Sequence, residues 1–124
     1  MHQCAWTQPP KNVLIIKKKG DSRVTNSVRD VILYMQEQYP HMNIIVEDHV
    51  WEQMGSQFPN LVPFQESTCD FRLNTGERSL LHRKTDFVVT VGGDGSILHV
   101  SSLFDQHPVP PVLSFSMGTL GFLL

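Results

Sequence analysis

Residues 87–104, Phe-Val-Val-Thr-Val-Gly-Gly-Asp-Gly-Ser-Ile-Leu-His-Val-Ser-Ser-Leu-Phe, join an apolar run to a glycine-rich turn and a helix-like continuation. The apolar run at 87–91 predicts a strand, because a strand covered on both faces is apolar throughout. The glycines at 92, 93 and 95 predict a turn in which the backbone takes positive φ and comes close to a ligand. The stretch therefore predicts a strand, a turn and a helix of an α/β fold.

Asp94 is the carboxylate within this turn. The N-terminus of the following helix offers unpaired N–H groups and a positive dipole end, which favour a bound phosphate. A carboxylate beside phosphate needs a metal ion or accepts a proton from an attacking hydroxyl, so the turn indicates phosphoryl transfer. The structural alternative is that Asp94 only caps a helix that begins near Ser96. Leu98 stands where the dinucleotide fingerprint needs glycine, and the Lys-Ser or Lys-Thr pair of a P-loop is absent.

A second glycine-bearing turn follows the next predicted strand. Residues 110–116, Pro-Pro-Val-Leu-Ser-Phe-Ser, predict the strand, and residues 117–122, Met-Gly-Thr-Leu-Gly-Phe, predict the turn. Because ligands bind where the carboxyl ends of parallel strands meet, both turns are expected to line one crevice. The alternative for Gly118 and Gly121 is an ordinary turn that ends a strand.

The two motifs together resemble those of the NAD kinases, most closely the fungal and other eukaryotic members. The first motif is Val-Gly-Gly-Asp-Gly-Ser at 91–96, and diacylglycerol kinases, sphingosine-type lipid kinases and phosphofructokinases carry a similar turn. The second is Gly-Thr-Leu-Gly-Phe-Leu at 118–123, which singles out the NAD kinases. The resemblance runs from Val13 to Leu124, with the sharp motifs confined to residues 87–124.

The resemblance implies ATP-dependent phosphorylation of the 2′-hydroxyl of the adenosine ribose of NAD, which gives NADP, with a divalent cation such as Mg²⁺. Asp94 would be the catalytic proton acceptor. Leu98 and Phe122 would be apolar walls for NAD, with core packing as the alternative for each. No residue is assigned as a metal ligand. The residues expected to bind nucleotide phosphates are Gly92, Gly93, Gly95, Ser96, Gly118, Thr119 and Gly121.

The length fits one domain of a larger enzyme. The 124 residues are 40% hydrophobic and 18% charged, which is typical of a single globular domain. NAD kinases continue into a β-rich second domain that completes the NAD site, and Leu124 precedes any such region. We therefore expect a flexible leader at 1–11 and an N-terminal nucleotide-binding domain at 12–124 that is inactive alone. The resemblance also implies a homo-oligomer when the protein is full length.

Composition also limits the classes of partner and the cellular location that we expect. A formal net charge of −2 gives no basic surface for nucleic acid. No run approaches the roughly 18 apolar residues of a membrane helix. The sequence does not open on a basic and then apolar leader, and Cys4 and Cys69 fit thiols of a reducing compartment. These features predict a cytoplasmic protein whose partners are small nucleotides.

The order of elements along the chain predicts a doubly wound, mostly parallel sheet of the phosphofructokinase and NAD kinase type. Residues 13–16 and 44–46 are apolar runs typical of buried strands. Residues 24–39 place valine, isoleucine, methionine and tyrosine at helical spacing, and Pro40 ends the helix. A short helix is expected after the second strand. Ile97, Val100, Leu103 and Phe104 are expected to dock the helix after the first turn onto the sheet.

Two regions give weaker signals. Between residues 59 and 85 the periodicity fades, and at most one short strand is expected, around 68–73. The basic residues at 78–84 could reach a nucleotide phosphate, and a solvated loop is the alternative. The lysines at 17–19 leave the first strand at the edge where both turns are expected, and a solvated strand end is the alternative.

Two other functions stay open at this stage. A lipid kinase of the diacylglycerol kinase type would share the turn at 92–95 but would not carry the motif at 118–122. A non-catalytic nucleotide-binding or flavodoxin-like module would bind a ligand at the same loops without turnover.

Overall fold

The computed structural model describes residues 11–17, 22–65, 69–72, 78–92, 95–104, 107–116 and 119–121. The strands are β1 (Asn12–Lys17), β2 (Asn43–Glu47), β3 (Leu61–Gln65), β4 (Asp70–Arg72), β5 (Arg78–Leu80), β6 (Phe87–Val91), β7 (Val112–Ser116) and β8 (Thr119–Gly121). The helices are α1 (Ser22–Gln38), α2 (Asp48–Met54), α3 (Leu81–Lys84) and α4 (Gly95–Phe104), with a 3-10 turn at Gly55–Gln57.

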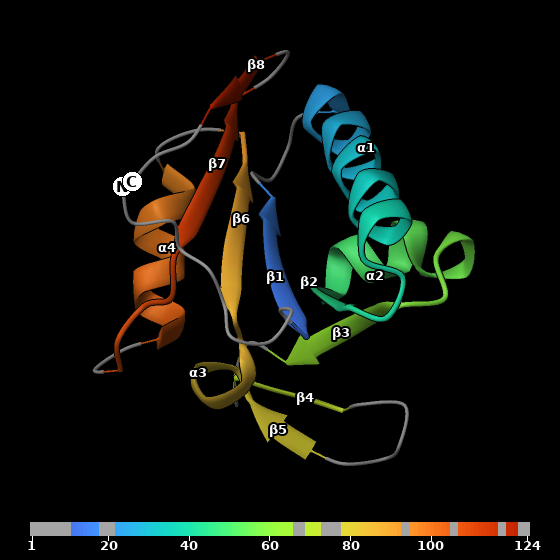
Figure 1. Cartoon of the computed structure of the whole chain (residues 1–124). Helices are drawn as coiled ribbons and strands as arrows, with labels where there is room; N and C mark the ends of the chain where they lie inside the picture. The colour runs from blue at the N-terminus through green and yellow to red at the C-terminus, as the bar shows by residue number, and fades with distance from the viewer. Residues whose placement is uncertain are drawn as a thin grey trace, which may run out of the picture.

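The strands form one sheet in the order β5-β4-β3-β2-β1-β6-β7-β8 (Figure 1). The strands from β3 to β7 in this order are parallel, and β4, β5 and β8 add antiparallel edges. At the centre, Leu14 of β1 lies opposite Ile45 of β2 and Val88 of β6. Every residue of β1 and of β6 is buried, as their apolar sequences predict. The expected mostly parallel sheet is confirmed.

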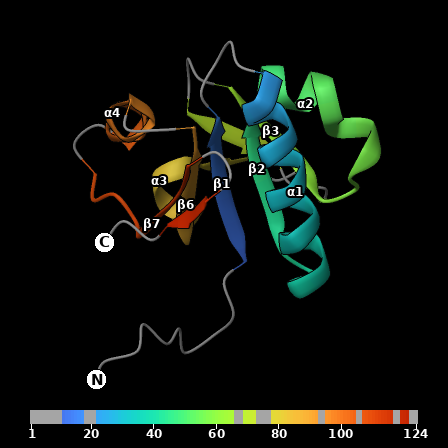
Figure 2. The same cartoon turned by 90° about the horizontal axis from the view of Figure 1, so that it is seen from above.

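Helices cover both faces of the sheet, so the doubly wound architecture is also confirmed. Figure 2 shows α1 and α2 on one side and α4 on the other, with the sheet between them. The first core joins Val13 and Ile15 of β1 to Val28 of α1 and Val50 of α2. The second joins the alternate strand residues to apolar residues of α3 and α4. It includes Leu14, Ile16, Ile45, Val88, Leu81, Val100, Leu103 and Phe104.

Helix α1 follows its predicted apolar stripe, because Val24, Val28, Val31, Ile32 and Met35 are all buried. The helix ends at Gln38, before Pro40. Tyr39, expected on the same apolar face, lies just beyond the helix end and is 43% exposed. That part of the prediction is wrong, because the helical spacing no longer applies once the helix has ended.

The region from 59 to 85 contains more structure than expected. It holds β3, β4, β5 and α3 instead of one short strand. Pro63 lies inside β3, an uncommon position because proline cannot donate to a ladder. The ladder described between β3 and β4 covers only Phe64 and Gln65, so Pro63 is paired only on the β2 side. Strands β4 and β5 have three residues each, too few to show a period.

Three residues of the second predicted turn, at 117–122, form a strand instead. Thr119–Gly121 forms β8, which pairs antiparallel with β7 through Ser116 opposite Thr119 and Ser114 opposite Gly121. Two residues separate the two strands in sequence, a spacing typical of a hairpin. Thr119 and Gly121 therefore belong to a strand and not to a loop.

The amino edge of the sheet is joined by Asp86, which precedes β6. Its Oδ2 accepts hydrogen bonds from the backbone N–H of Lys11, at 2.7 Å, and of Asn12, at 2.8 Å. Residues 1–10 of the predicted leader lie outside the described residues. Within the described part, no helix is both long enough and apolar enough to cross a membrane.

Candidate active site

The carboxyl edge of the sheet brings the two motif regions together. Strands β1, β2, β6 and β7 run parallel, so Lys17, Glu47, Val91 and Ser116 all end at this edge. Val91 lies one pairing step from the end of β7, opposite Phe115. The segment that begins at Gly92 therefore leaves the sheet beside the segment that follows Ser116, as predicted.

Gly92 begins the first turn with a φ of 116°. This is a backbone conformation that residues with a side chain rarely adopt, so glycine is required here for the reason the sequence suggested. Helix α4 begins at Gly95, one residue earlier than predicted, and Ser96 is its second residue. Gly93 and Asp94, between these two points, lie outside the described residues.

Of the remaining predicted site residues, some lie outside the described part of the chain and one, Leu98, is described. Gly118 and Phe122 lie outside the described residues, so their roles stay predictions, as do those of Gly93 and Asp94. Leu98 lies on α4 and is 77% exposed. The core-packing alternative for Leu98 is therefore wrong, and its side chain is accessible to a ligand or to another part of the protein.

Lys17 and the basic cluster at 78–84 lie at opposite edges of the sheet, while Lys18 and Lys19 lie outside the described residues. Lys17 ends β1 opposite Val91 and is only 7% exposed, so it is not a solvated strand end. Arg78 begins β5, and Arg83 and Lys84 belong to α3, which leads into the amino end of β6. Figure 1 shows α3 and β5 at the end of β6 away from its arrowhead. This cluster lies at the opposite end of β6 from the first turn, and contact with a nucleotide phosphate stays a prediction.

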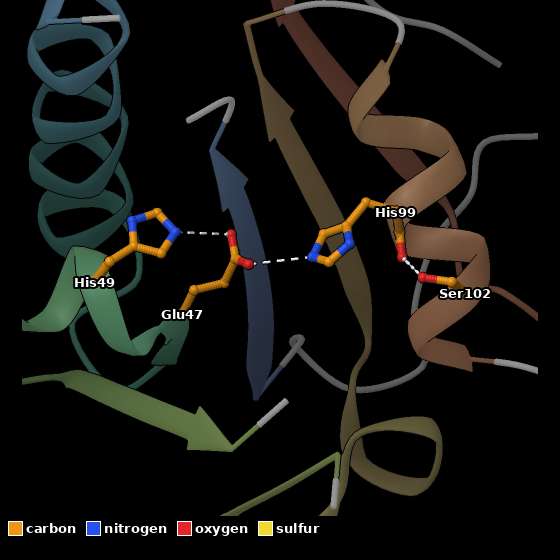
Figure 3. A network of polar contacts seen from close by, with 4 residues as sticks. All are labelled: Glu47, His49, His99 and Ser102. Atoms are coloured by element: carbon orange, nitrogen blue, oxygen red, sulfur yellow. Dashed lines mark hydrogen bonds and ion pairs between the residues drawn. The ribbon is translucent and has the colours of Figure 1, made fainter. Parts of the chain in front are cut away.

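Sequence reasoning missed Glu47, which ends β2 and is 4% exposed. Its Oε2 lies 3.1 Å from Nε2 of His99 on α4. Its Oε1 lies 3.4 Å from Nε2 of His49 on α2. Figure 3 shows the carboxylate between the two imidazoles. The three side chains thus connect helices on the two faces of the sheet across its carboxyl edge.

The two contacts of Glu47 are unequal. The contact with His99 has hydrogen-bond geometry, whereas Oε1 and the His49 Nε2 are buried atoms that lack a hydrogen bond of acceptable geometry. A buried carboxylate is costly unless it is hydrogen-bonded or paired with a charge. His99 therefore supplies the principal directional partner of Glu47. A polar residue directly after an apolar strand at the ligand-binding edge was the available sequence signal.

A second polar contact joins β6 to β7 close to the carboxyl edge of the sheet. Thr90 Oγ1 on β6 donates a hydrogen bond to Ser114 Oγ on β7, at 3.1 Å. Thr90 is fully buried and Ser114 is 8% exposed. This contact joins the two strands that carry the motif segments, one residue before the end of β6.

The described part of the chain offers no set of side chains that would ligate a resident metal ion. Among those residues, no group of three or more His, Cys, Asp and Glu side chains is arranged to hold a metal ion.

Comparison with known proteins gives consistent matches. A family model described as the ATP-NAD kinase N-terminal domain matches residues 13–124. A mitochondrial NADH kinase of Schizosaccharomyces pombe is 42% identical over 124 residues, which are 100% of this chain and 29% of that protein. A mitochondrial NADH kinase of Saccharomyces cerevisiae is 38% identical over 118 residues, covering 95% of this chain and 28% of that protein.

A solved structure agrees with these matches. The crystal structure of yeast NADH kinase complexed with NADH has a TM-score of 0.71 and 34% identity, over 95% of this chain and 34% of that chain. The chain thus spans about a third or less of the length of the proteins it matches.

The predicted cytoplasmic location is contradicted by the same relatives. Both fungal NADH kinases are named mitochondrial, and a probable NAD kinase of Oryza sativa, 40% identical over 118 residues, is named chloroplastic. The prediction depended on the lack of a secretory leader. Organellar transit peptides are instead amphipathic and rich in arginine and serine, a pattern that the test for a secretory leader does not detect.

The match of the family model covers most of the chain and includes both motif segments. The two fungal relatives and the solved structure carry kinase names of the same kind. The chain therefore belongs to the ATP-NAD kinase family, of which it contains the N-terminal domain.

Proposed function

We propose that the protein containing this domain transfers the γ-phosphoryl group of ATP to the 2′-hydroxyl of the adenosine ribose of NAD or NADH. The observation that carries the proposal is the connection from β6 to α4. Gly92 at a φ of 116° leads from the sheet edge to a helix that begins at Gly95, beside the end of β7. Such a junction favours bound phosphate, because helix N–H groups and the helix dipole both attract anions.

In this proposal Asp94 accepts the proton of the ribose hydroxyl as the new oxygen–phosphorus bond forms. A hydroxyl is a poor nucleophile until a base takes its proton in the transition state. The backbone at Gly92, Gly93, Gly95 and Ser96 would bind phosphate, and Gly118, Thr119 and Gly121 would complete the phosphate site. Mg²⁺ bound with ATP would neutralise charge on the transferring group. Leu98, which is exposed, and Phe122 would contact NAD.

The remaining parts of the proposal concern the whole protein. The names of the fungal relatives support a mitochondrial location. NADH in the solved neighbour supports a nicotinamide dinucleotide as the substrate. We also expect the second domain to be required for turnover and the full-length protein to be a homo-oligomer, which light scattering after size exclusion measures.

The test is NADP or NADPH formation from ATP, Mg²⁺ and either NAD or NADH. It is run in parallel on the 124-residue chain and on the gene product extended to its natural C-terminus. Activity is expected in the extended protein. Asp94→Asn should lower kcat by roughly 10²- to 10⁴-fold, the usual contribution of a general base. The control is Asp30→Asn, which changes an exposed carboxylate on α1.

Two results would overturn the proposal. A folded, extended protein that phosphorylates neither dinucleotide would exclude it, and phosphorylation of diacylglycerol by that protein would identify a lipid kinase instead. Full activity of the Asp94→Asn variant would leave the family assignment in place but remove Asp94 as the base.

A further inference from the structure

We propose that the hydrogen bond between Glu47 and His99 is a positioning contact of the active site. It would hold the start of α4 against the end of β2 and so fix the connection between Gly92 and Gly95. This inference rests on the proposed function, because it assigns the contact a role in phosphoryl transfer. Glu47 and His99 would be positioning residues that act through the helix, without touching the substrate.

Among the described side chains of α4, the buried apolar ones lie toward the end of the helix and His99 lies before them. The buried apolar side chains described on α4 are Val100, Leu103 and Phe104, all in its second half. Leu98, nearer the start, is 77% exposed. His99 stands four residues after Gly95, one turn into the helix. Among the side chains described on α4, His99 is therefore the polar anchor nearest the glycine-rich connection.

The other end of the contact is rigid. Glu47 is the last residue of β2, which is paired with β1 on one side and with β3 on the other. Its side chain is 5% exposed, while that of His99 is 29% exposed. The hydrogen bond from His99 has an ordinary length of 3.1 Å, and the burial of Glu47 favours it because water competes poorly for the acceptor. The sheet edge thus offers a fixed acceptor to a helix that carries the site.

Small movements of α4 would matter to the chemistry. Gly92 is fixed by β6, and Gly95 moves with α4, so a shift of the helix changes the span that Gly93 and Asp94 must cross. A catalytic group displaced by about 1 Å can cost about 100-fold in rate. Loss of the His99 contact should therefore lower kcat more than it changes KM for either substrate.

The experiment compares four variants of the gene product extended to its natural C-terminus. His99→Ala removes the N–H donor, and His99→Gln keeps an N–H donor on a side chain of similar reach. Ser102→Ala is the matched control on α4, since this exposed hydroxyl donates a hydrogen bond to the His99 backbone oxygen, at 2.7 Å, and lies outside the contact with Glu47. His49→Ala removes the other imidazole beside Glu47 without touching α4.

Two readouts are taken for each variant: kcat and KM for phosphorylation of NAD and NADH, and amide hydrogen exchange of residues 95–104. We expect His99→Ala to lower kcat about 10-fold or more, with KM within about threefold, and to speed exchange in α4. His99→Gln should restore most of kcat. Ser102→Ala and His49→Ala should stay within about twofold of the unchanged protein in kcat.

The outcomes separate this inference from the proposed function. If exchange in α4 is unchanged in His99→Ala, the positioning contact is refuted, whatever the activity. If exchange rises but kcat stays within about twofold, the contact is only structural. An equal loss in His49→Ala would point to the charge of Glu47 and overturn the role of α4. If the unchanged protein phosphorylates neither dinucleotide while exchange rises in His99→Ala, the proposed function fails and the role in phosphoryl transfer falls with it.

Discussion

Thr90→Val is expected to lower the free energy of unfolding by about 1–3 kcal/mol. Valine has nearly the shape of threonine, so the packing of the fully buried site is kept and the hydroxyl alone is lost. The lost hydrogen bond to Ser114 contributes about 1 kcal/mol, and a buried oxygen left without its donor costs about 1–3 kcal/mol. Ser114→Ala should cost a similar amount, because it leaves the Thr90 hydroxyl without this acceptor.

The double variant Thr90→Val with Ser114→Ala gives the sharper test. Replacing both partners by apolar groups removes the unsatisfied atom, so its cost should be clearly less than the sum of the two single costs. Urea unfolding followed by circular dichroism measures all four proteins. With a slope of about 1–3 kcal/mol/M, a loss of about 2 kcal/mol moves the midpoint by about 1 M. Additive costs, or an unchanged midpoint in Thr90→Val, would refute the reasoning.

Three further changes test other parts of the molecule. Asp86→Ala removes the acceptor of the Lys11 and Asn12 N–H groups and should cost about 2–3 kcal/mol in urea unfolding, with Asp86→Asn milder. Gly92→Ala places a side chain at a φ of 116° and should cost about 1–3 kcal/mol, so an unshifted midpoint would contradict the described turn. Leu98→Ala should leave stability within about 0.5 kcal/mol, since the side chain is 77% exposed. If Leu98 contacts the dinucleotide, the KM for NAD or NADH should rise roughly fivefold in the Leu98→Ala variant. An unchanged KM would remove Leu98 from the site.

The centre of the fold could be predicted because its signals are local. The apolar runs at 13–16, 44–46 and 87–91 are long enough to indicate buried strands without any partner. The edges of the sheet could not. Strands β4, β5 and β8 have three residues each, and they exist because a neighbouring strand provides their hydrogen bonds. Three residues give no period to detect.

The candidate site, like the fold, could be predicted only where its signals are local in the sequence. The positive φ at Gly92 follows from a run of glycines after a strand, which is local information. The contact of Glu47 with His99 joins residues 52 positions apart and depends on β2, β1 and β6 being neighbours in that order. The position of Glu47 directly after an apolar strand is a local signal, but nothing in the sequence marks His99 as its partner, so only the topology shows the contact.

The central place of β1 has a consequence for biosynthesis. Val13 pairs with Ile44 on one side and with Phe87 on the other, so one flank of β1 is completed early in translation and the other late. A nascent chain that has emerged only as far as β3 presents the second flank of β1 as an open, apolar edge. Such edges invite aggregation and chaperone binding until the missing strand arrives. The order of synthesis thus leaves this flank of β1 open until β6 has emerged, after which β7 and β8 extend the sheet on the same side.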